Sequence, residues 1–368
     1  MNGANPQQPP IEAQQPPIET QQSLIEPQQP PIEIFSTCPQ SAVADRRSYL
    51  QEVIAAARWS ERAGCTGILV YSDNSQIDPW LLSQIIIEHT SHLSPLVAVQ
   101  PVYMHPHTAA TMVSTLGYLF RRRVYLNMVA GGFKNDLTVL GDETPHDARY
   151  ARLIEYTTIL SRLLASSSPV SYSGAFYKVE HLRMFPPLDP DLAPRIFVSG
   201  SSESGLAAAT ALQATAIHYP EPSGQYADRL LEDSIRHGIR IGIVARESER
   251  TAWEVAHNYF PEDRRGQLTQ QVAMKISDSA WHRQLSQLGD TTTGNPYWLI
   301  PFQNYKTFCP YLVGSHDQVA AELAAYIRCG MRTFILDIPR QEEDLDHINA
   351  AFRRAIELLA CQSYCRIG

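Results

Sequence analysis

Apolar segments with strand character alternate with segments of helical periodicity along most of the chain, and this alternation constrains the fold more than any single motif. The eight predicted strands span residues 32–37, 66–71, 95–102, 123–129, 195–199, 214–219, 239–245 and 333–338. The predicted helices span residues 48–62, 79–89, 108–120, 148–164, 206–212, 226–237, 251–259, 316–328 and 344–359. Repeated strand–helix units of this number are typical of a closed parallel TIM (β/α)8 barrel, an α/β fold.

An open, doubly wound sheet is the alternative α/β architecture, but no predicted strand is followed by the G-x-G-x-x-G pattern of dinucleotide-binding sheets. Two insertions exceed ordinary connections. Residues 167–190 resemble a hairpin turned at Ser173-Gly174, and residues 260–314 are too long for a simple loop. Because active sites of such barrels lie at the C-terminal ends of the strands, we expect the insertions at this mouth, with residues 260–314 lying over it.

The first 31 residues differ in composition from the rest of the chain. Residues 7–33 contain QQPPIE three times and QQSLIE once, at heptad spacing. Proline breaks helices, so this repeat favours an extended, disordered leader over a coiled coil. The predicted domains are therefore a Pro/Gln-rich leader, residues 1–31, and a single barrel, residues 32–368.

Composition narrows the possible partners and location. With 44% hydrophobic and 18% charged residues, the chain has the apolar content for a large core, and its net charge of −8 argues against nucleic-acid binding. No run of about 18 apolar residues predicts a membrane span, and no secretion signal is present. The six cysteines lack convincing metal-ligand spacing, so we expect reduced thiols in a cytoplasmic protein without a metal site.

Three motifs follow predicted strands. The strand LNMVAGG ends in small residues after Asn127, which opens space at the strand end. The strand IFVSGSSESG runs into a helix at Ser201 and Ser202, which fits either an N-cap or a phosphate site at a helix N-terminus. The helix start PHDARY presents Tyr150, whose hydroxyl is a candidate for the same phosphate, although a surface helix start is the plainer interpretation.

Four segments, in the same order, resemble the bacterial luciferase-like flavin-dependent monooxygenases, closest to the alkanesulfonate monooxygenase branch. They are LNMVAGG, HDARY, SYSGAFYKVEHLRMFPP and VSGSSESG. The similarity implies a barrel with reduced FMN across its C-terminal mouth. Carried over by position, it places Asp73, Asn127, Ala130 and Gly131 at the flavin ring, and Tyr150, Gly200, Ser201 and Ser202 at the phosphate.

The sulfonate-binding residues of that branch are mostly absent. Gln76 stands where those enzymes carry a cysteine, Gly242 where they carry a histidine, and the arginine of their lid falls at Tyr305 or Lys306. A different and less anionic substrate is therefore expected. Lys306 and Arg340 are cations, however, so a substrate with an anionic group stays an alternative.

The catalytic candidates are Arg240, His218 and Tyr219. Arg240 is retained from the family pattern, and a charged side chain in an apolar strand is costly unless a ligand or carboxylate meets it. His218 ends the sixth predicted strand and is either an acid–base group or a partner of a loop carbonyl. Tyr219 is expected to form a wall of the substrate pocket.

The resemblance implies a two-component monooxygenase that takes reduced FMN (FMNH2) from a separate flavin reductase and uses O2 as co-substrate. The expected substrate is a small organic or carrier-bound specialised metabolite, and the expected assembly is a homodimer. Two alternatives stay open: an F420-dependent hydride-transfer enzyme of the same superfamily, and a non-catalytic flavin-binding or structural subunit.

Overall fold

The computed structural model describes residues 31–131, 134–226, 231, 234–268 and 295–364. Residues Ile32–Gly368 group as one compact unit, which is the unit described below. The predicted disordered leader falls almost wholly on residues outside the described part, as does the middle of the 260–314 insertion.

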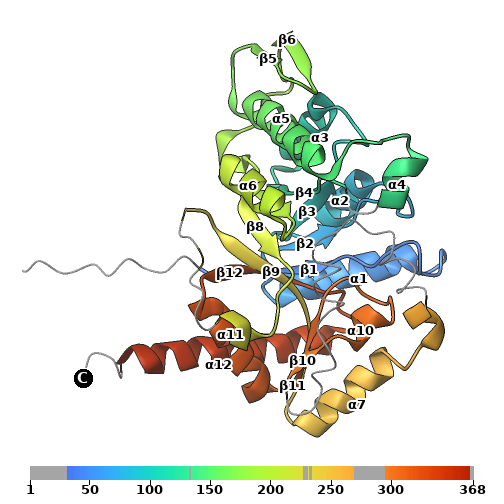
Figure 1. Cartoon of the computed structure of the whole chain (residues 1–368), viewed down its shortest axis with the longest axis vertical. Helices are drawn as coiled ribbons and strands as arrows, with labels where there is room; N and C mark the ends of the chain where they lie inside the picture. The colour runs from blue at the N-terminus through green and yellow to red at the C-terminus, as the bar shows by residue number, and fades with distance from the viewer. Residues whose placement is uncertain (1–30, 132–133, 227–230, 232–233, 269–294, 365–368) are drawn as a thin grey trace, which may run out of the picture. The chain divides into compact units, whose positions relative to one another are not determined.

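Eight parallel strands close into a barrel (Figure 1). They are β1 (Glu33–Thr37), β2 (Gly67–Val70), β3 (Ser94–Val99), β4 (Tyr125–Met128), β7 (Ile196–Ser199), β8 (Thr215–His218), β9 (His237–Arg246) and β12 (Met331–Leu336). Each pairs with the next in this order, and pairing of β12 with β1 completes the ring. The predicted closed barrel is confirmed, and the open sheet is excluded.

Most of the barrel strands are linked through helices that begin close to their predicted positions. They are α1 (Tyr49–Arg62), α2 (Pro79–Glu88), α3 (Pro106–Phe120), α5 (His146–Ala165), α6 (Glu203–Ala211), α7 (Glu249–Tyr259), α11 (His316–Arg328) and α12 (Glu342–Tyr364). Local chemistry sets several starts. Asp78 accepts hydrogen bonds from the first N–H groups of α2, and Ser315 with Gln318 forms a capping box on α11.

Some short elements were not predicted from the sequence: α4 (Lys134–Val139), α10 (Ile300–Gln303) and the 3-10 turns η1 (Pro190–Leu192) and η2 (Ser223–Tyr226). The helix predicted for residues 226–237 lies partly outside the described residues, and its end was wrong because His237 is the first residue of β9. Alternating β-branched residues from Ile239 onward marked the strand, while the polar residues before them gave no strand signal.

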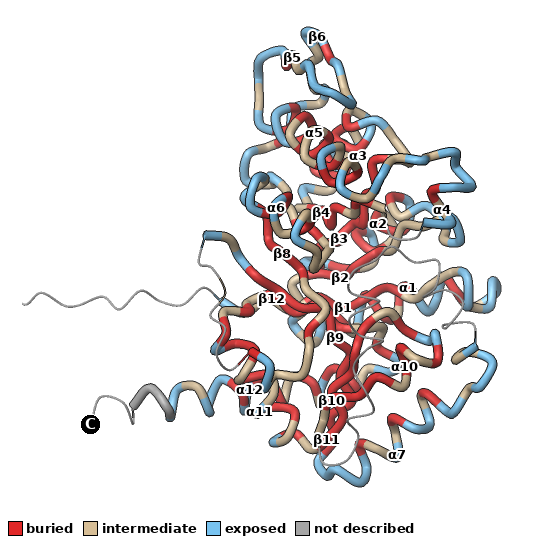
Figure 2. Tube along the Cα trace, in the orientation of Figure 1, coloured by how far each residue is buried: buried red, intermediate tan, exposed pale blue. Residues whose placement is uncertain are grey.

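Side chains inside the barrel form an apolar floor. Seven strands contribute to it through Phe35, Leu69, Leu96, Tyr125, Phe197, Ile217 and Ile335. The alternate residues of β4, Leu126 and Met128, pack outward against the helices. Figure 2 shows the strands as the most continuously buried part of the molecule. Strand alternation therefore separates a closed interior from a helix-covered exterior.

Strand β9 is longer than its neighbours and belongs to two sheets. Its first half pairs with β8 and β12, and residues 242–246 pair with β11 (Tyr311–Ser315). The added strand β11 carries β10 (Tyr297–Trp298) antiparallel to it. The C-terminal end of the 260–314 insertion is thus fixed to the barrel strand β9 by main-chain hydrogen bonds.

The predicted hairpin at residues 167–190 is confirmed as β5 (Val170–Ser173) paired with β6 (Lys178–Leu182). The Glu155 carboxylate of α5 accepts hydrogen bonds from the backbone N–H groups of three turn residues, Ala175, Phe176 and Tyr177. Figure 1 shows the hairpin beyond α5 and α3. Within the described residues, no helix is both long and apolar enough to cross a bilayer.

We expect the fold to lose the most stability when a side chain of the apolar floor is truncated. Phe35 is fully buried, and its ring centroid lies 5.2 Å from that of Tyr125 and 5.3 Å from that of Phe197. Phe35→Ala is expected to lower the free energy of unfolding by about 3–5 kcal/mol, because it opens a cavity among packed rings. Urea unfolding measures the change.

Phe185→Ala is the control, since this ring is 83% exposed and its loss is expected to cost less than about 0.5 kcal/mol. Equal stability losses in the two variants would contradict the role assigned to the floor.

Candidate functional site

A layer of polar and aromatic side chains lies above the apolar floor, at the C-terminal ends of the strands. Each member follows a floor residue by two positions, so strand alternation turns it to the same interior side. These members are Tyr71, Asn127, Ser199, Tyr219 and Asp337, after Leu69, Tyr125, Phe197, Ile217 and Ile335. Arg240 joins the layer from β9, between the outward-packed Ile239 and Ile241.

Asn127 is the interior residue of its pair on β4, because Met128 packs outward. The Asn127 side chain is 5% exposed, and its Oδ1 accepts a 2.8 Å hydrogen bond from the Ser199 hydroxyl on the neighbouring strand. The bond fixes the orientation of the Asn127 amide. Ser199 was not singled out from the sequence.

The residues predicted around a phosphate lie together at the turn from β7 to α6. Gly200 has φ +154°, and a Cβ atom there would lie 2.4 Å from the Tyr150 hydroxyl. Ser202 is the N-cap of α6 and accepts a hydrogen bond from the Gly205 N–H at 3.1 Å, while Ser201 Oγ accepts one from the Tyr219 N–H at 3.4 Å. The first N–H groups of any helix lack intrahelical acceptors, so this turn has the donors that an anion needs.

Ala130 and Gly131 end β4 as predicted, but a local cause explains the glycine. Gly131 has φ +141°, and a Cβ atom there would lie 2.8 Å from the Leu137 side chain. Backbone conformation and the neighbouring leucine therefore require glycine at this position, whatever else lies against it. Ala130 is 5% exposed and packs in the apolar cluster outside the barrel.

Asp73 lies in the loop after β2, where its carboxylate accepts hydrogen bonds from the backbone N–H and hydroxyl of Ser75. Together with Gln100, Trp80 and Tyr103 it lines a cavity of about 220 Å³ between the ends of β2 and β3. Burial, and then the nearby Asp73, raise the pKa of Asp136. The side of the mouth around these residues is acidic.

Arg240 is the strongest unmet polar group of the layer. It is 6% exposed, and its guanidinium carbon lies 4.8 Å from the centre of the Tyr71 ring. Its Nη2 lies 3.9 Å from Asp337 Oδ1, a separation too long for a hydrogen bond. No acceptor among the described residues meets Nε or Nη2. A buried charge with unmet donors is costly, which favours a ligand at this position.

Tyr219 and His218 point to opposite sides of β8. Tyr219 follows the floor residue Ile217 by two positions, which places it with the interior layer. Burial, then Cys309 and Asp337, raise the pKa of the Tyr219 hydroxyl, so it stays protonated. His218 instead lies against His237, with a 2.9 Å contact between Nε2 and Nδ1. The outward parity of Ala216 places His218 away from the interior layer.

The insertion contributes side chains to the mouth. The Phe308 ring packs edge-on to Tyr71 with centroids 6.5 Å apart, and Tyr305 packs against Phe308. Lys306 is paired with Asp263 at 2.6 Å, while the Arg340 guanidinium lies over the rings of Tyr259 and Phe260. Lys306 and Arg340, the two cations considered as partners of an anionic substrate, thus both contact groups of the protein itself.

Sequence reasoning missed Asp337 and Tyr311. The Tyr311 hydroxyl donates a 2.7 Å hydrogen bond to Asp337 Oδ2. Asp337 carried a usable signal, since it follows the floor residue Ile335 by two positions. Tyr311 carried none, because it lies 71 residues from Arg240 along the chain and reaches the site only through the pairing of β11 with β9.

A closed parallel barrel with polar side chains and insertions at its C-terminal mouth is the architecture of the TIM-barrel enzymes. Comparison with known proteins identifies the family. The luciferase-like monooxygenase model matches residues 32–333, so the chain belongs to that family. The predicted family and the expectation of an oxidoreductase enzyme are confirmed.

One relative is the 4-(gamma-L-glutamylamino)butanoyl-[BtrI acyl-carrier protein] monooxygenase BtrO of Niallia circulans. It is 35% identical over 313 residues, which cover 83% of this chain and 91% of the relative.

Solved structures share the fold. Long-chain alkane monooxygenase LadA aligns with a TM-score of 0.68 at 17% identity, covering 88% of this chain and 92% of LadA. DmoA from Hyphomicrobium sulfonivorans aligns with 0.70 at 17% identity, covering 89% and 88%. An F420-dependent secondary alcohol dehydrogenase aligns with 0.59 at 15% identity, covering 88% and 99%.

The histidine pair predicts a pH effect on stability. Burial, and then His237, lower the pKa of His218 to about 4 from 6.5. The folded protein therefore keeps His218 neutral while the unfolded chain gains a proton as pH falls from 6.5 toward 4, so stability decreases over that window. His218→Gln is expected to reduce this loss by about 1–2 kcal/mol, measured by urea unfolding at several pH values.

The exposed His92 provides the control variant His92→Gln, for which we expect the wild-type pH dependence. If His218→Gln loses as much stability as the wild type between pH 6.5 and 4, the assignment of His218 as a buried neutral imidazole is wrong.

Proposed function

We propose that this protein is an FMNH2-dependent monooxygenase that receives reduced flavin from a separate reductase and oxygenates a small organic or carrier-bound metabolite. Family membership supports the reaction class, and BtrO, by its name, acts on an acyl group held by a carrier protein. The observation that carries the proposal is Arg240, a buried cation with unmet hydrogen-bond donors inside the mouth. The turn from β7 to α6, which has the N–H donors that a phosphate needs, lies at the same end of the barrel.

The residues present fit FMN. Gly200 lets the Tyr150 hydroxyl lie close to the main chain of the turn, because a Cβ atom at position 200 would come within 2.4 Å of that hydroxyl. A phosphate at this turn would therefore meet the hydroxyl and the main chain together. Ser201, Ser202 and the first turn of α6 would hold the phosphate. Asn127, Ala130, Gly131 and Asp73 would border the ring. When bound, reduced flavin supplies the electrons that activate O2.

The protein's own groups would position and shield the reactants. Asn127, oriented by Ser199, would hold a polar edge of the ring. The floor and the Tyr71–Phe308 contact would exclude water from below and from one side. Arg240 would donate hydrogen bonds to the oxygen of the reacting group. Tyr219 would form the pocket wall, and the geometry offers no comparable role for His218.

The alternative within catalysis is F420-dependent hydride transfer, supported by the fold likeness to an F420-dependent dehydrogenase. A non-catalytic flavin-binding or structural subunit is a second alternative, although an inert protein has no need to bury Arg240 with unmet hydrogen-bond donors. We keep a cytoplasmic homodimer as part of the proposal. Large exposed apolar residues on α2 and α3, Leu81, Tyr118 and Leu119, would suit a subunit contact.

Tyr150 gives a direct test of the phosphate position. Tyr150→Phe is expected to weaken FMN binding about tenfold or more, because a hydrogen bond to a charged group contributes about 1.5–3 kcal/mol. Quenching of FMN fluorescence on titration measures the dissociation constant.

Tyr156→Phe is the matched control on the same helix. Its hydroxyl is buried and meets no partner among the described residues, so FMN affinity is expected to stay at the wild-type value. Equal affinities for all three proteins would place the phosphate elsewhere.

The function itself is tested with photoreduced FMN, oxygen-18 gas and a metabolite extract of the source organism. Mass spectrometry is expected to find a metabolite that gains one oxygen-18 atom only when protein and reduced flavin are both present. Arg240→Met should bind FMN normally and form at least about tenfold less product. Anaerobic oxidation of reduced F420 without oxygen-18 incorporation would favour hydride transfer instead.

A further inference from the structure

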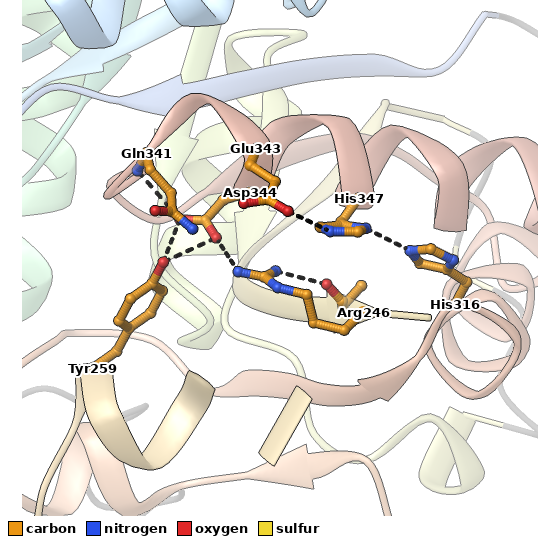
Figure 3. A network of polar contacts seen from close by, with 8 residues as sticks. Arg246, Tyr259, His316, Gln341, Glu343, Asp344 and His347 are labelled. Carbon is orange, nitrogen blue, oxygen red and sulfur yellow. Dashed lines mark hydrogen bonds and ion pairs between the residues drawn. The ribbon is translucent and has the colours of Figure 1, made fainter. Parts of the chain in front are cut away.

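Two buried arginine–aspartate–tyrosine groups share strand β9, and one of them is closed. Arg246 Nη2 donates to Asp344 Oδ1 at 2.6 Å, and Arg246 Nη1 donates to the Ala245 carbonyl at 2.7 Å. The Tyr259 hydroxyl lies 3.1 Å from both oxygens of Asp344 (Figure 3). We call Arg246, Asp344 and Tyr259 the closed triad. Its charges are paired with each other, and it has the bonding expected of a structural ion pair.

The other group, Arg240, Asp337 and Tyr311, has the same three residue types but is open. Tyr311 bonds Asp337 at 2.7 Å, yet Arg240 stays 3.9 Å from that carboxylate. Arg240 Nε and Nη2 and the hydroxyl of the adjacent Tyr71 are buried without a hydrogen-bond partner in the described part of the chain. The open triad and the adjacent Tyr71 therefore have three unmet polar atoms between them on the interior side of the mouth.

Tyr311 holds the carboxylate of the open triad through its hydroxyl. Its ring lies where a side chain at position 242 would be, since a Cβ on Gly242 would come within 2.3 Å of it. Burial, and then Asp337, raise the pKa of the Tyr311 hydroxyl, so it stays a hydrogen-bond donor to the carboxylate. Gly242 and Tyr311 thus fix Asp337 beside Arg240 but not on it.

The charges of the open triad select among ligands. A lone buried guanidinium attracts a carboxylate or sulfonate, but here Asp337 already offsets the charge. A second carboxylate would meet Asp337 at close range in a site of low dielectric. Arg340 does not reverse this balance, because it is exposed to solvent and stacked over Tyr259 and Phe260. An uncharged oxygen acceptor meets the unmet donors without this repulsion.

We propose that Arg240 and Asp337 form a charge-balanced subsite that binds the uncharged carbonyl oxygen of a thioester or amide and rejects the free carboxylate. This inference rests on the proposed function and deepens it, because it names the form in which the substrate enters: the acyl group while it is still attached to its carrier. A free acid of the same chain would be excluded by Asp337.

The test compares two small probes, butanoate and the S-ethyl thioester of butanoic acid, by ligand-observed NMR on the full chain with oxidised FMN. The thioester is expected to bind at least about tenfold more tightly than butanoate. Asp337→Asn should tighten butanoate binding about tenfold and change thioester binding less than about threefold. Asp344→Asn makes the same change in the closed triad and should lower the melting temperature without altering the ratio.

The proposal is overturned if butanoate binds the wild type as tightly as the thioester, if neither binds, or if Asp337→Asn leaves butanoate affinity unchanged. Should Asp337→Asn not fold, Tyr311→Phe replaces it. That variant frees Asp337 to close onto Arg240 and should weaken thioester binding about tenfold, and unchanged binding would count against the subsite.

These affinities involve no turnover. If the protein incorporates oxygen-18 but does not prefer the thioester over butanoate, the subsite alone is wrong. If it prefers the thioester but never incorporates oxygen-18, the proposed function alone is wrong.

Discussion

The packing of aromatic and aliphatic side chains inside the closed barrel is the constraint on which the site depends. Phe35, Tyr125 and Phe197 meet edge to face and fill the interior with rings. A filled interior leaves no path for a ligand through the barrel, so binding is confined to one end. Because each strand alternates, the floor also determines which residues stand above it. The choice of inward-facing core residues on each strand therefore determines which side chains line the mouth.

That dependence explains how far the sequence could be interpreted. The strands, most helices and the hairpin followed from hydrophobic periodicity, because each is a local pattern with its own buried face. The motifs around Gly200, Ser202 and Tyr150 also had local signals, and the fold brings them to one turn. Asn127 was recognised as a candidate, and the packing of Met128 decided which of the two faces inward.

What could not be predicted depended on contacts between distant parts of the chain. The side of the strand to which His218 turns is set by its neighbour His237, which sequence reasoning had placed in a helix. The glycine requirement at position 131 comes from Leu137 in a helix with no clear periodicity. Tyr311 reaches Asp337 only because β9 extends past the barrel. No local pattern encodes such a meeting.

Strand β9 holds Arg240 and Arg246 on one continuous backbone, six residues apart. The tightly bonded arginine anchors the far end of the strand to the start of α12 and so limits how far the strand can slide along its axis. The height of the other arginine within the mouth is therefore fixed from outside the pocket. A substitution that leaves no acceptor at position 344 would therefore be felt as a mispositioned Arg240 guanidinium, even though it touches no ligand, whereas asparagine keeps an acceptor for Arg246.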